Sequence, residues 1–91
     1  MDRVNAQHIL VKTQHEAEDL LKKIEEGASF EQLASDFSSC PSGKQGGNLG
    51  SFGKGQMVPE FETAAFGLEI GQISGPVQTQ FGYHLIKRIE D

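Results

Sequence analysis

The stretch Gln80-Phe81-Gly82-Tyr83-His84-Leu85-Ile86 begins the last hydrophobic run of the chain, with a turn glycine and a histidine leading into it. A second histidine, His8, opens the run Gln7-His8-Ile9-Leu10-Val11 near the other end. Each histidine is followed by contiguous apolar residues, which are typical of central strands buried on both faces. Two neighbouring strands of this kind would bring two imidazoles from opposite ends of the chain together in one sheet.

Two amphipathic helices are expected after a first strand over Val4–Val11. Thr13 with Glu16, and then Ser29 with Gln32, have the spacing of capping boxes at helix starts. Apolar residues at helical spacing follow each pair, which predicts two helices that cover one face of a sheet. These residues are Ala17, Leu20, Leu21 and Ile24 in the first helix, and Phe30, Leu33, Ala34 and Phe37 in the second.

The segment from Cys40 to Gly55 holds six of the eleven glycines of the chain. A loop of this length inside a small domain is usually either functional or disordered. The regular apolar residues Leu49, Phe52 and Met57 favour an ordered segment, with a short edge strand over 48–52. The phosphate-binding patterns Gly-x-Gly-x-x-Gly and Gly-x-x-x-x-Gly-Lys-Ser/Thr are absent, so the glycines do not predict a nucleotide site.

The C-terminal part of the sequence completes the order of elements. Pro59 suits the first turn of a short helix. Strands are expected over 72–79 and 83–89, and Pro76 restricts the former to an edge or a bulge. The resulting order, β-α-α-β-α-β-β, predicts an α+β fold with a mostly antiparallel sheet. Because 91 residues cannot form two stable cores, a single domain over 1–91 is expected.

Composition and charge exclude several classes of protein. Thirteen acidic and eight basic residues give a net charge of −5, which argues against a nucleic-acid partner. The single cysteine excludes an internal disulfide. No run approaches the roughly 18 apolar residues of a membrane span, so no membrane insertion is expected. The sequence enters a patterned strand soon after Met1 without a signal peptide. We therefore expect a cytoplasmic location, with an excised domain of an exported periplasmic or cell-surface protein as the alternative.

Few side chains could carry chemistry: His8, His84, Cys40, Thr79 and Ser51. A zinc site made of the histidines and the cysteine would lack the close pairs, such as Cys-x-x-Cys, that zinc sites usually contain, so no metal is expected. A cysteine hydrolase with Cys40 as nucleophile and His84 as base would lack a recognisable local signature. Taken alone, each histidine is most simply a satisfied polar residue on a strand.

A series of short blocks along the chain resembles the parvulin-type peptidyl-prolyl cis/trans isomerases. No single block is specific, but all of them occur in the order of that family over essentially the whole length. The blocks are 7–12 (QHILVK), 30–34 (FEQLA), 37–38 (FS), 47–50 (GNLG), 55–61 (GQMVPEF), 65–66 (AF), 75–77 (GPV) and 81–86 (FGYHLI). The resemblance implies a parvulin-like member of the FKBP-like superfold, with a four-stranded sheet wrapped by three or more helices.

The resemblance also implies a set of site residues. His8 and His84 correspond to the paired central histidines beneath the active site of parvulins, and Thr79 to the hydroxyl residue that bonds into the pair. Cys40 falls where parvulins carry Cys or Asp, facing the prolyl amide of the substrate. The residues that match the pocket for the proline ring are Leu49, Met57 and Phe61, with Gln56 and Phe81 beside them.

The activity implied by the resemblance is isomerisation of X-Pro bonds in proline-containing peptides and unfolded proteins, in support of protein folding and without a cofactor. Because rotation about the amide breaks no covalent bond, we expect a non-covalent mechanism. In it Cys40 tunes the electrostatics near the carbonyl, and the histidines fix structure and tautomers rather than transfer protons.

Substrate choice and partners follow from the same comparison. Phospho-specific parvulins insert a basic loop between the first strand and the first helix, whereas only Thr13-Gln14-His15 joins them here. We therefore expect a monomeric, non-phospho-specific isomerase. The alternative is a catalytically weak peptide-binding or chaperone module of a larger folding factor.

Overall fold

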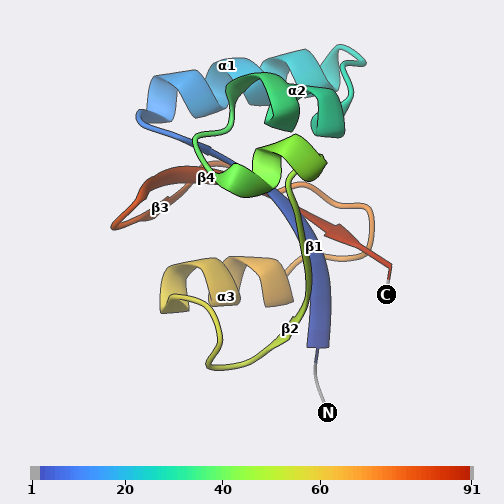
Figure 1. Ribbon diagram of the computed structural model, residues 1–91, viewed down its shortest axis with the longest axis vertical. Coiled ribbons are helices and arrows are strands. Elements are labelled where there is room, and N and C mark those ends of the chain that lie inside the picture. Colours follow the sequence, from blue (N-terminus) through green and yellow to red (C-terminus); the bar gives the residue numbers. More distant parts are fainter. Residues whose placement is uncertain (1–2, 91) are drawn as a thin grey trace.

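The computed structural model describes residues 3–90. Its α+β class and its order of helices and strands are those predicted from the sequence, with a 3-10 helix, η1, added in the glycine-rich segment (Figure 1). The elements are β1 (Arg3–Val11), α1 (Gln14–Glu25), α2 (Phe30–Phe37), η1 (Pro41–Gln45), β2 (Asn48–Gly53), α3 (Pro59–Phe66), β3 (Val77–Thr79) and β4 (Gly82–Ile89).

The four strands form one antiparallel sheet in the order β2-β1-β4-β3. The two histidine-bearing strands, β1 and β4, are therefore the central pair, as predicted. In their register Leu10 lies opposite His84, and His8 lies opposite Ile86. Because alternate residues of a strand share a face, His8 and His84 are diagonal neighbours on one face of the sheet, within reach of each other's rings.

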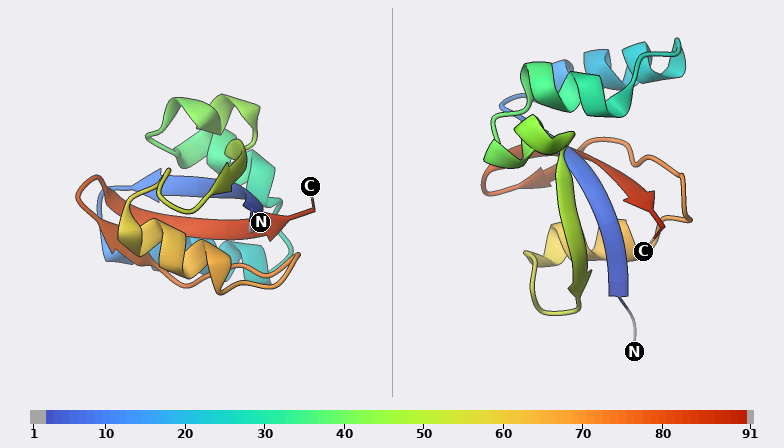
Figure 2. Two further views of the ribbon diagram at one scale, coloured as in Figure 1. Left: turned by 90° about the horizontal axis from the view of Figure 1, so that it is seen from below. Right: turned by 45° about the vertical axis from the view of Figure 1, so that its right-hand side comes forward.

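Each face of the sheet has its own apolar core. Helices α1 and α2 cover one face and α3 covers the other (Figures 1 and 2). Alternation along β1 divides its side chains between the two, which explains why the strand reads as continuously apolar. The first core contains Ile9, Val11, Ala17, Leu20, Phe30, Leu33, Ala34 and Leu85. The second contains Val4, Ala6, Phe52, Phe61, Ala65, Leu68 and Ile86.

Each predicted capping box forms only one of its two reciprocal hydrogen bonds between a side chain and a backbone amide. The Thr13 hydroxyl accepts from the Glu16 amide and also donates to the Glu16 carboxylate, each over 3.1 Å. The Ser29 hydroxyl accepts from the Gln32 amide over 3.2 Å, while the Gln32 side chain donates forward to Asp36 instead of back to Ser29. One backbone donor at each helix start is thus satisfied by a side chain, rather than two.

The strand predicted over 72–79 is shorter in the structure, where β3 covers only Val77–Thr79. The residues before it still lie along β4, since the Ser74 amide donates to the Ile86 carbonyl over 2.8 Å. Pro76 has no N–H group and cannot extend a ladder of hydrogen bonds, which accounts for the late start of the strand.

The glycine-rich segment is ordered, as predicted, and Gly47 fastens it to β1. The His8 amide donates to the Gly47 carbonyl over 2.9 Å. Gly47 has a φ of +83°, and a Cβ atom there would overlap the carbonyl oxygen of His8. Only glycine therefore allows the segment to approach the histidine strand so closely.

Replacing Gly47 by alanine should destabilise the fold more than its positive φ alone would. Gly50 is a matched control, because its φ is +76° and nothing lies within 4 Å of its Cβ position. We expect Gly50→Ala to cost about 1–2 kcal/mol for the left-handed backbone, and Gly47→Ala about 1–3 kcal/mol more for the overlap. Urea unfolding of both variants measures the difference. Equal losses of unfolding free energy would show that the close approach has no energetic weight.

Candidate active site

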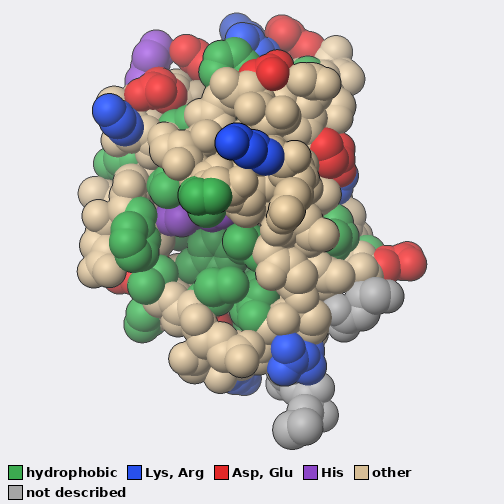
Figure 3. Space-filling view, viewed as in Figure 1, with side chains coloured by type: hydrophobic (Ala, Val, Ile, Leu, Met, Phe, Trp, Pro, Cys, Tyr) green, Lys and Arg blue, Asp and Glu red, His purple; other side chains and the backbone are tan. Residues whose placement is uncertain are grey.

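An apolar cavity of about 440 Å³ opens on the face of the sheet that α3 covers. Met57, just before α3, and Phe61 within it supply one side, and Cys40 and Pro41 supply the rim toward η1. His8 and His84 line the floor. In Figure 3 histidine atoms are visible in a hollow surrounded by hydrophobic side chains. A cavity of this kind suits a compact apolar group such as a proline ring.

The histidine pair is the most polar feature of the cavity floor. Nδ1 of His8 lies 3.0 Å from Nδ1 of His84, and the two rings are nearly parallel at 18° with centroids 5.1 Å apart. A hydrogen bond between two imidazole nitrogens needs one donor and one acceptor, so one proton lies between them. The contact therefore requires at least one neutral imidazole.

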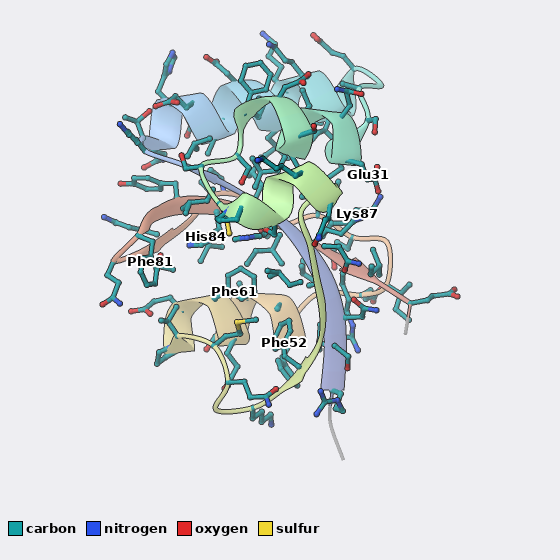
Figure 4. The ribbon with its side chains drawn as sticks, in the orientation of Figure 1. Glu31, Phe52, Phe61, Phe81, His84 and Lys87 are labelled. Carbon is teal, nitrogen blue, oxygen red and sulfur yellow. The ribbon has the colours of Figure 1, made fainter. Side chains whose placement is uncertain are left out.

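Phe61 presses its ring against both histidines from α3. Its centroid lies 5.6 Å from that of His8 and 5.2 Å from that of His84, with interplanar angles of 79° and 83°. Figure 4 shows Phe61 and His84 pointing toward one another. Such edge-to-face contacts are favourable between aromatic rings and leave little room for water.

Burial disfavours the charged form of both imidazoles. Removal from water, with a smaller contribution from the neighbouring His84, lowers the pKa of His8 to about 4. Burial also lowers the pKa of His84. Both rings are consequently neutral near pH 7, in agreement with the single proton shared by the two Nδ1 atoms.

Thr79 forms a hydrogen bond with the outer nitrogen of His84, Nε2. Its hydroxyl lies 2.8 Å from Nε2 of His84, and it accepts a hydrogen bond from the Phe81 amide over 3.2 Å. Thr79 sits at the end of β3, directly before the turn into β4, and is buried with 8% of its surface exposed. The short β3 thus serves the site by bringing this hydroxyl behind His84.

Ser42, in η1, forms a hydrogen bond with the outer nitrogen of His8, Nε2. Its hydroxyl lies 3.2 Å from Nε2 of His8 and donates to Cys40 Sγ over 3.3 Å. Pro41 is the first residue of η1, and the tight 3-10 turn that it begins lets Cys40 and Ser42 both lie on the side of the segment that faces the histidines. Ser42 was not among the site residues predicted from the sequence. The sequence feature that points to it is its position two residues after Cys40.

The structure brings the site residues expected from the sequence together. Those that line the cavity are His8, Cys40, Leu49, Gln56, Met57, Phe61, Phe81 and His84, and Leu10, Ser39, Pro41 and Val58 line it as well. Thr79 lies behind His84. Phe81 remains 62% exposed at the edge of the cavity (Figure 4). The Gln56 side chain accepts from the Gly53 amide over 2.7 Å, so its oxygen braces its own loop.

Two observations concern metal ions and membranes. Within residues 3–90, no three His, Cys, Asp or Glu side chains are grouped so that they could hold a metal ion. In the same part of the chain, every helix is too short or too polar to cross a membrane.

The fold is that of a small rotamase domain. The family model of the PPIC-type PPIase domain matches residues 6–90, and the chain therefore belongs to the PPIC-type peptidyl-prolyl cis/trans isomerases, the parvulins. The family predicted from the sequence is thus confirmed.

Similar proteins include both long foldases and a protein of the same size. The chain is 54% identical to foldase protein PrsA 2 of Bacillus anthracis over 92% of its own length, but spans only 30% of that relative. It matches the crystal structure of PrsA from Bacillus subtilis with a TM-score of 0.95 and 46% identity, over 98% of this chain and 35% of that one. It also matches the solution structure of NmPin, the parvulin of Nitrosopumilus maritimus, with a TM-score of 0.89 and 44% identity, over 99% of this chain and 98% of NmPin.

The depressed pKa values predict a loss of stability on acidification. The pKa of His8 is about 6.5 in the unfolded chain and about 4 in the folded one, so between these pH values the unfolded chain binds more protons than the native one. The free energy of unfolding therefore falls as the pH drops from about 6.5 toward about 4. Each histidine contributes a slope of up to about 1.4 kcal/mol per pH unit. Urea unfolding at several pH values measures the slope.

Two variants assign this slope to the buried pair. His8→Asn should flatten the slope, whereas His15→Gln, at an exposed position on α1, should leave it unchanged. Stability that does not fall between about pH 6.5 and pH 4.5 in the parent chain would contradict the neutral pair.

Proposed function

We propose that this domain accelerates rotation about X-Pro peptide bonds in unfolded or extended polypeptides and so assists protein folding. The observation that supports this most directly is the apolar cavity, in which Met57 and Phe61 lie over a floor of two buried, neutral histidines. The cavity would grip the proline ring on one side of the rotating bond while the rest of the peptide stays outside.

The proposed mechanism is non-covalent. Resonance in the amide gives rotation a barrier of about 18–20 kcal/mol, and the twisted amide has lost that resonance. An apolar, water-poor cavity disfavours the strongly dipolar planar amide relative to the less polar twisted one. A preference of about 4 kcal/mol for the twisted form would accelerate rotation about 10³-fold. No bond is broken, so neither a proton acceptor nor a cofactor is required by the step.

Roles for the individual side chains follow from this mechanism. Met57, Phe61 and Leu49 hold the ring, with Gln56 and Phe81 at the edge of the cavity. Cys40, at the rim, faces the prolyl carbonyl and shapes the field there. His8, His84 and Thr79 keep the floor rigid and neutral. The depressed pKa of His8 supports a structural role, because a cationic imidazole is not available from it at neutral pH.

We further propose that the domain does not require a phosphorylated substrate. Strand β1 ends at Val11 and α1 begins at Gln14, with Thr13 as its N-cap, so no loop is available there to hold a phosphate. The net charge of −5 also opposes a dianionic ligand.

The wider context of the domain is also a proposal. The chain spans about a third of the foldases it resembles, and we propose that it works as the single, monomeric isomerase domain of a larger exported folding factor. A solved structure 44% identical to this chain belongs to work on PEB4 and the periplasmic protein Cj1289, two SurA-like chaperones of Campylobacter jejuni, which favours that location over the cytoplasm. The size of NmPin supports a self-contained fold. A second candidate function is a catalytically weak module that merely holds extended chains.

The Met57→Ala variant tests whether the cavity is the catalytic site. Loss of the half-buried thioether side chain should lower kcat/KM for an Ala-Pro peptide about tenfold or more. Ile70→Ala is the matched control, because Ile70 is a large apolar residue that is 59% exposed and does not line the cavity. A parent chain that binds the peptide but does not accelerate its isomerisation would favour the holding module.

Cys40→Asp in the same assay separates the two roles of the cysteine. Aspartate keeps a polar, acceptor group at the rim but cannot act as a thiolate nucleophile, so a non-covalent enzyme should retain activity within about tenfold of the parent chain. Complete loss of activity in a folded Cys40→Asp variant would support covalent attack on the carbonyl.

A peptide series tests the substrate class. We expect kcat/KM for a phosphoserine-proline peptide to be at least about tenfold below that for the alanine-proline peptide, because no cationic loop offsets the desolvation of the phosphate. A glutamate-proline peptide separates the effect of charge from that of the phosphate group. Equal or faster turnover of the phosphopeptide would contradict the proposal.

A further inference from the structure

A second hollow, of about 300 Å³, adjoins the apolar cavity on the side of α2 and η1. Ser39, Cys40 and Pro41 line both hollows, so a polypeptide that fills the cavity can continue into its neighbour across a shared rim. The other residues that line the second hollow are Ser35, Ser38, Gly43 and Lys44. Three serines and a lysine make this second space a polar hollow, in contrast to the apolar cavity beside it.

The walls of the polar hollow are held in place by the fold. The Ser38 hydroxyl accepts from the Leu10 amide over 3.0 Å and from the Cys40 amide over 3.3 Å. On the opposite wall η1 approaches α2 so closely that a Cβ atom on Gly43 would lie 2.6 Å from the Ala34 carbonyl oxygen. The absence of a side chain at Gly43 therefore allows the two helices to meet and to enclose the hollow.

Three polar side chains that line the hollow are not engaged by other residues of the described chain. Within residues 3–90, the side chains of Ser35, Ser39 and Lys44 form no hydrogen bond or ion pair. The acid next to Ser35 in the sequence, Asp36, accepts instead from the Gln32 side chain over 3.1 Å. Figure 3 shows Lys or Arg atoms directly above the hollow that contains the histidine atoms. An ammonium group only donates, so Lys44 and the two hydroxyls suit a negatively charged acceptor.

We propose that the polar hollow is a substrate subsite, in which Lys44 binds the carboxylate of an aspartate or glutamate two or three residues before the proline. The inference rests on the proposed function, in which the proline ring occupies the apolar cavity and Cys40 faces the carbonyl of the rotating bond. That carbonyl belongs to the residue before the proline. The part of the substrate that passes Cys40 toward the polar hollow is therefore its N-terminal part.

The spacing follows from the length of an extended chain, which advances about 3.3 Å per residue. The residue directly before the proline lies at the rim, because its carbonyl is the one that Cys40 faces. One or two further residues carry the chain over Ser39 and Pro41 into the polar hollow. The subsite is thus separate from the position directly before the proline.

A single carboxylate suits this subsite better than a phosphate. Lys44 is the one cationic side chain that lines the hollow. Helix α2 ends beside it at Phe37, and the C-terminal end of a helix carries a partial negative charge that opposes an anion. The net charge of −5 acts in the same direction. Because Lys44 is exposed, its ion pair is screened by water, and the expected gain in affinity is about two- to fivefold.

Binding of matched peptides tests the subsite without reference to catalysis. Peptides with blocked ends carry an Ala-Pro pair and either glutamate or glutamine two or three residues before the proline, and amide NMR titration measures their affinities. We expect the glutamate peptides to bind about two- to fivefold more tightly at low salt. The difference should nearly vanish at about 0.5 M salt. Equal affinities at low salt would overturn the proposal.

Lys44→Gln assigns the preference to one side chain. The ratio of the two affinities should fall to about one in Lys44→Gln and should be retained in Lys44→Arg, which keeps the charge. Lys22→Gln, at an exposed position on α1, makes the same change in net charge and should leave the ratio as in the parent chain. A preference that survives in a folded Lys44→Gln variant would contradict the proposal, as would an equal loss in Lys22→Gln.

Glutamate on the other side of the proline tests the direction of the substrate. Two or three residues after the proline, it should bind no better than glutamine, because that part of the chain leaves the cavity away from Cys40. A gain at these positions, with none before the proline, would contradict the placement of the N-terminal part in the polar hollow.

Kinetics separate this inference from the proposed function. In an active enzyme, glutamate before the proline should lower KM about two- to fivefold and leave kcat within about twofold, because Lys44 holds a part of the substrate that does not change during rotation. A parent chain that prefers the glutamate peptides but does not isomerise them would remove the proposed function and keep the subsite. An active isomerase without the preference would keep the function and remove the subsite. A change in kcat alone would contradict a role of Lys44 in binding.

Discussion

The site depends on a single contact, the 3.0 Å approach of two imidazole nitrogens in the middle of a buried sheet. One proton has to serve both nitrogens, so the pair cannot be doubly protonated without breaking the contact. Burial acts in the same direction by lowering the pKa of both rings. Once the pair is neutral, the outer nitrogen of each ring must find a partner, and Thr79 and Ser42 provide the two partners. The geometry of the whole cavity floor follows from that requirement.

The fold is arranged to hold this contact. The register of β1 on β4 makes the histidines diagonal neighbours, and α3 seals them with the edge of the Phe61 ring. On the other side of the site, the glycine-rich segment can reach the histidine strand only because Gly47 has no side chain. The segment then carries Cys40 and Ser42 to the rim. A domain with a core on each face of one sheet thus places an apolar hollow over a polar but uncharged floor.

The sequence predicted the fold because its local signals agree with one another. Continuous apolar runs marked β1 and β4 as central strands, and the helical stripes and Pro59 marked the three helices. The strand over 72–79 was predicted too long, because the pattern of its side chains does not reveal where Pro76 ends the ladder. Ser42 was missed for a different reason. Its role comes from a 3-10 turn that aims one hydroxyl at two partners, and such a turn has no periodic pattern to read.

The neutral pair also bears on why this architecture suits a rotation rather than a hydrolysis. A hydrolase needs a base that takes a proton and becomes cationic during the reaction. His8 is poorly suited to that task, because the same burial that lowers its pKa to about 4 makes its cation costly. Rotation about an amide bond requires no such base. Rotation of the amide requires a rigid apolar pocket that holds the proline ring. It also requires an electrostatic field at the prolyl carbonyl that stays constant during the rotation. In the proposed mechanism, two neutral imidazoles, each hydrogen-bonded at its outer nitrogen, satisfy that requirement, because their dipoles are fixed before the substrate arrives.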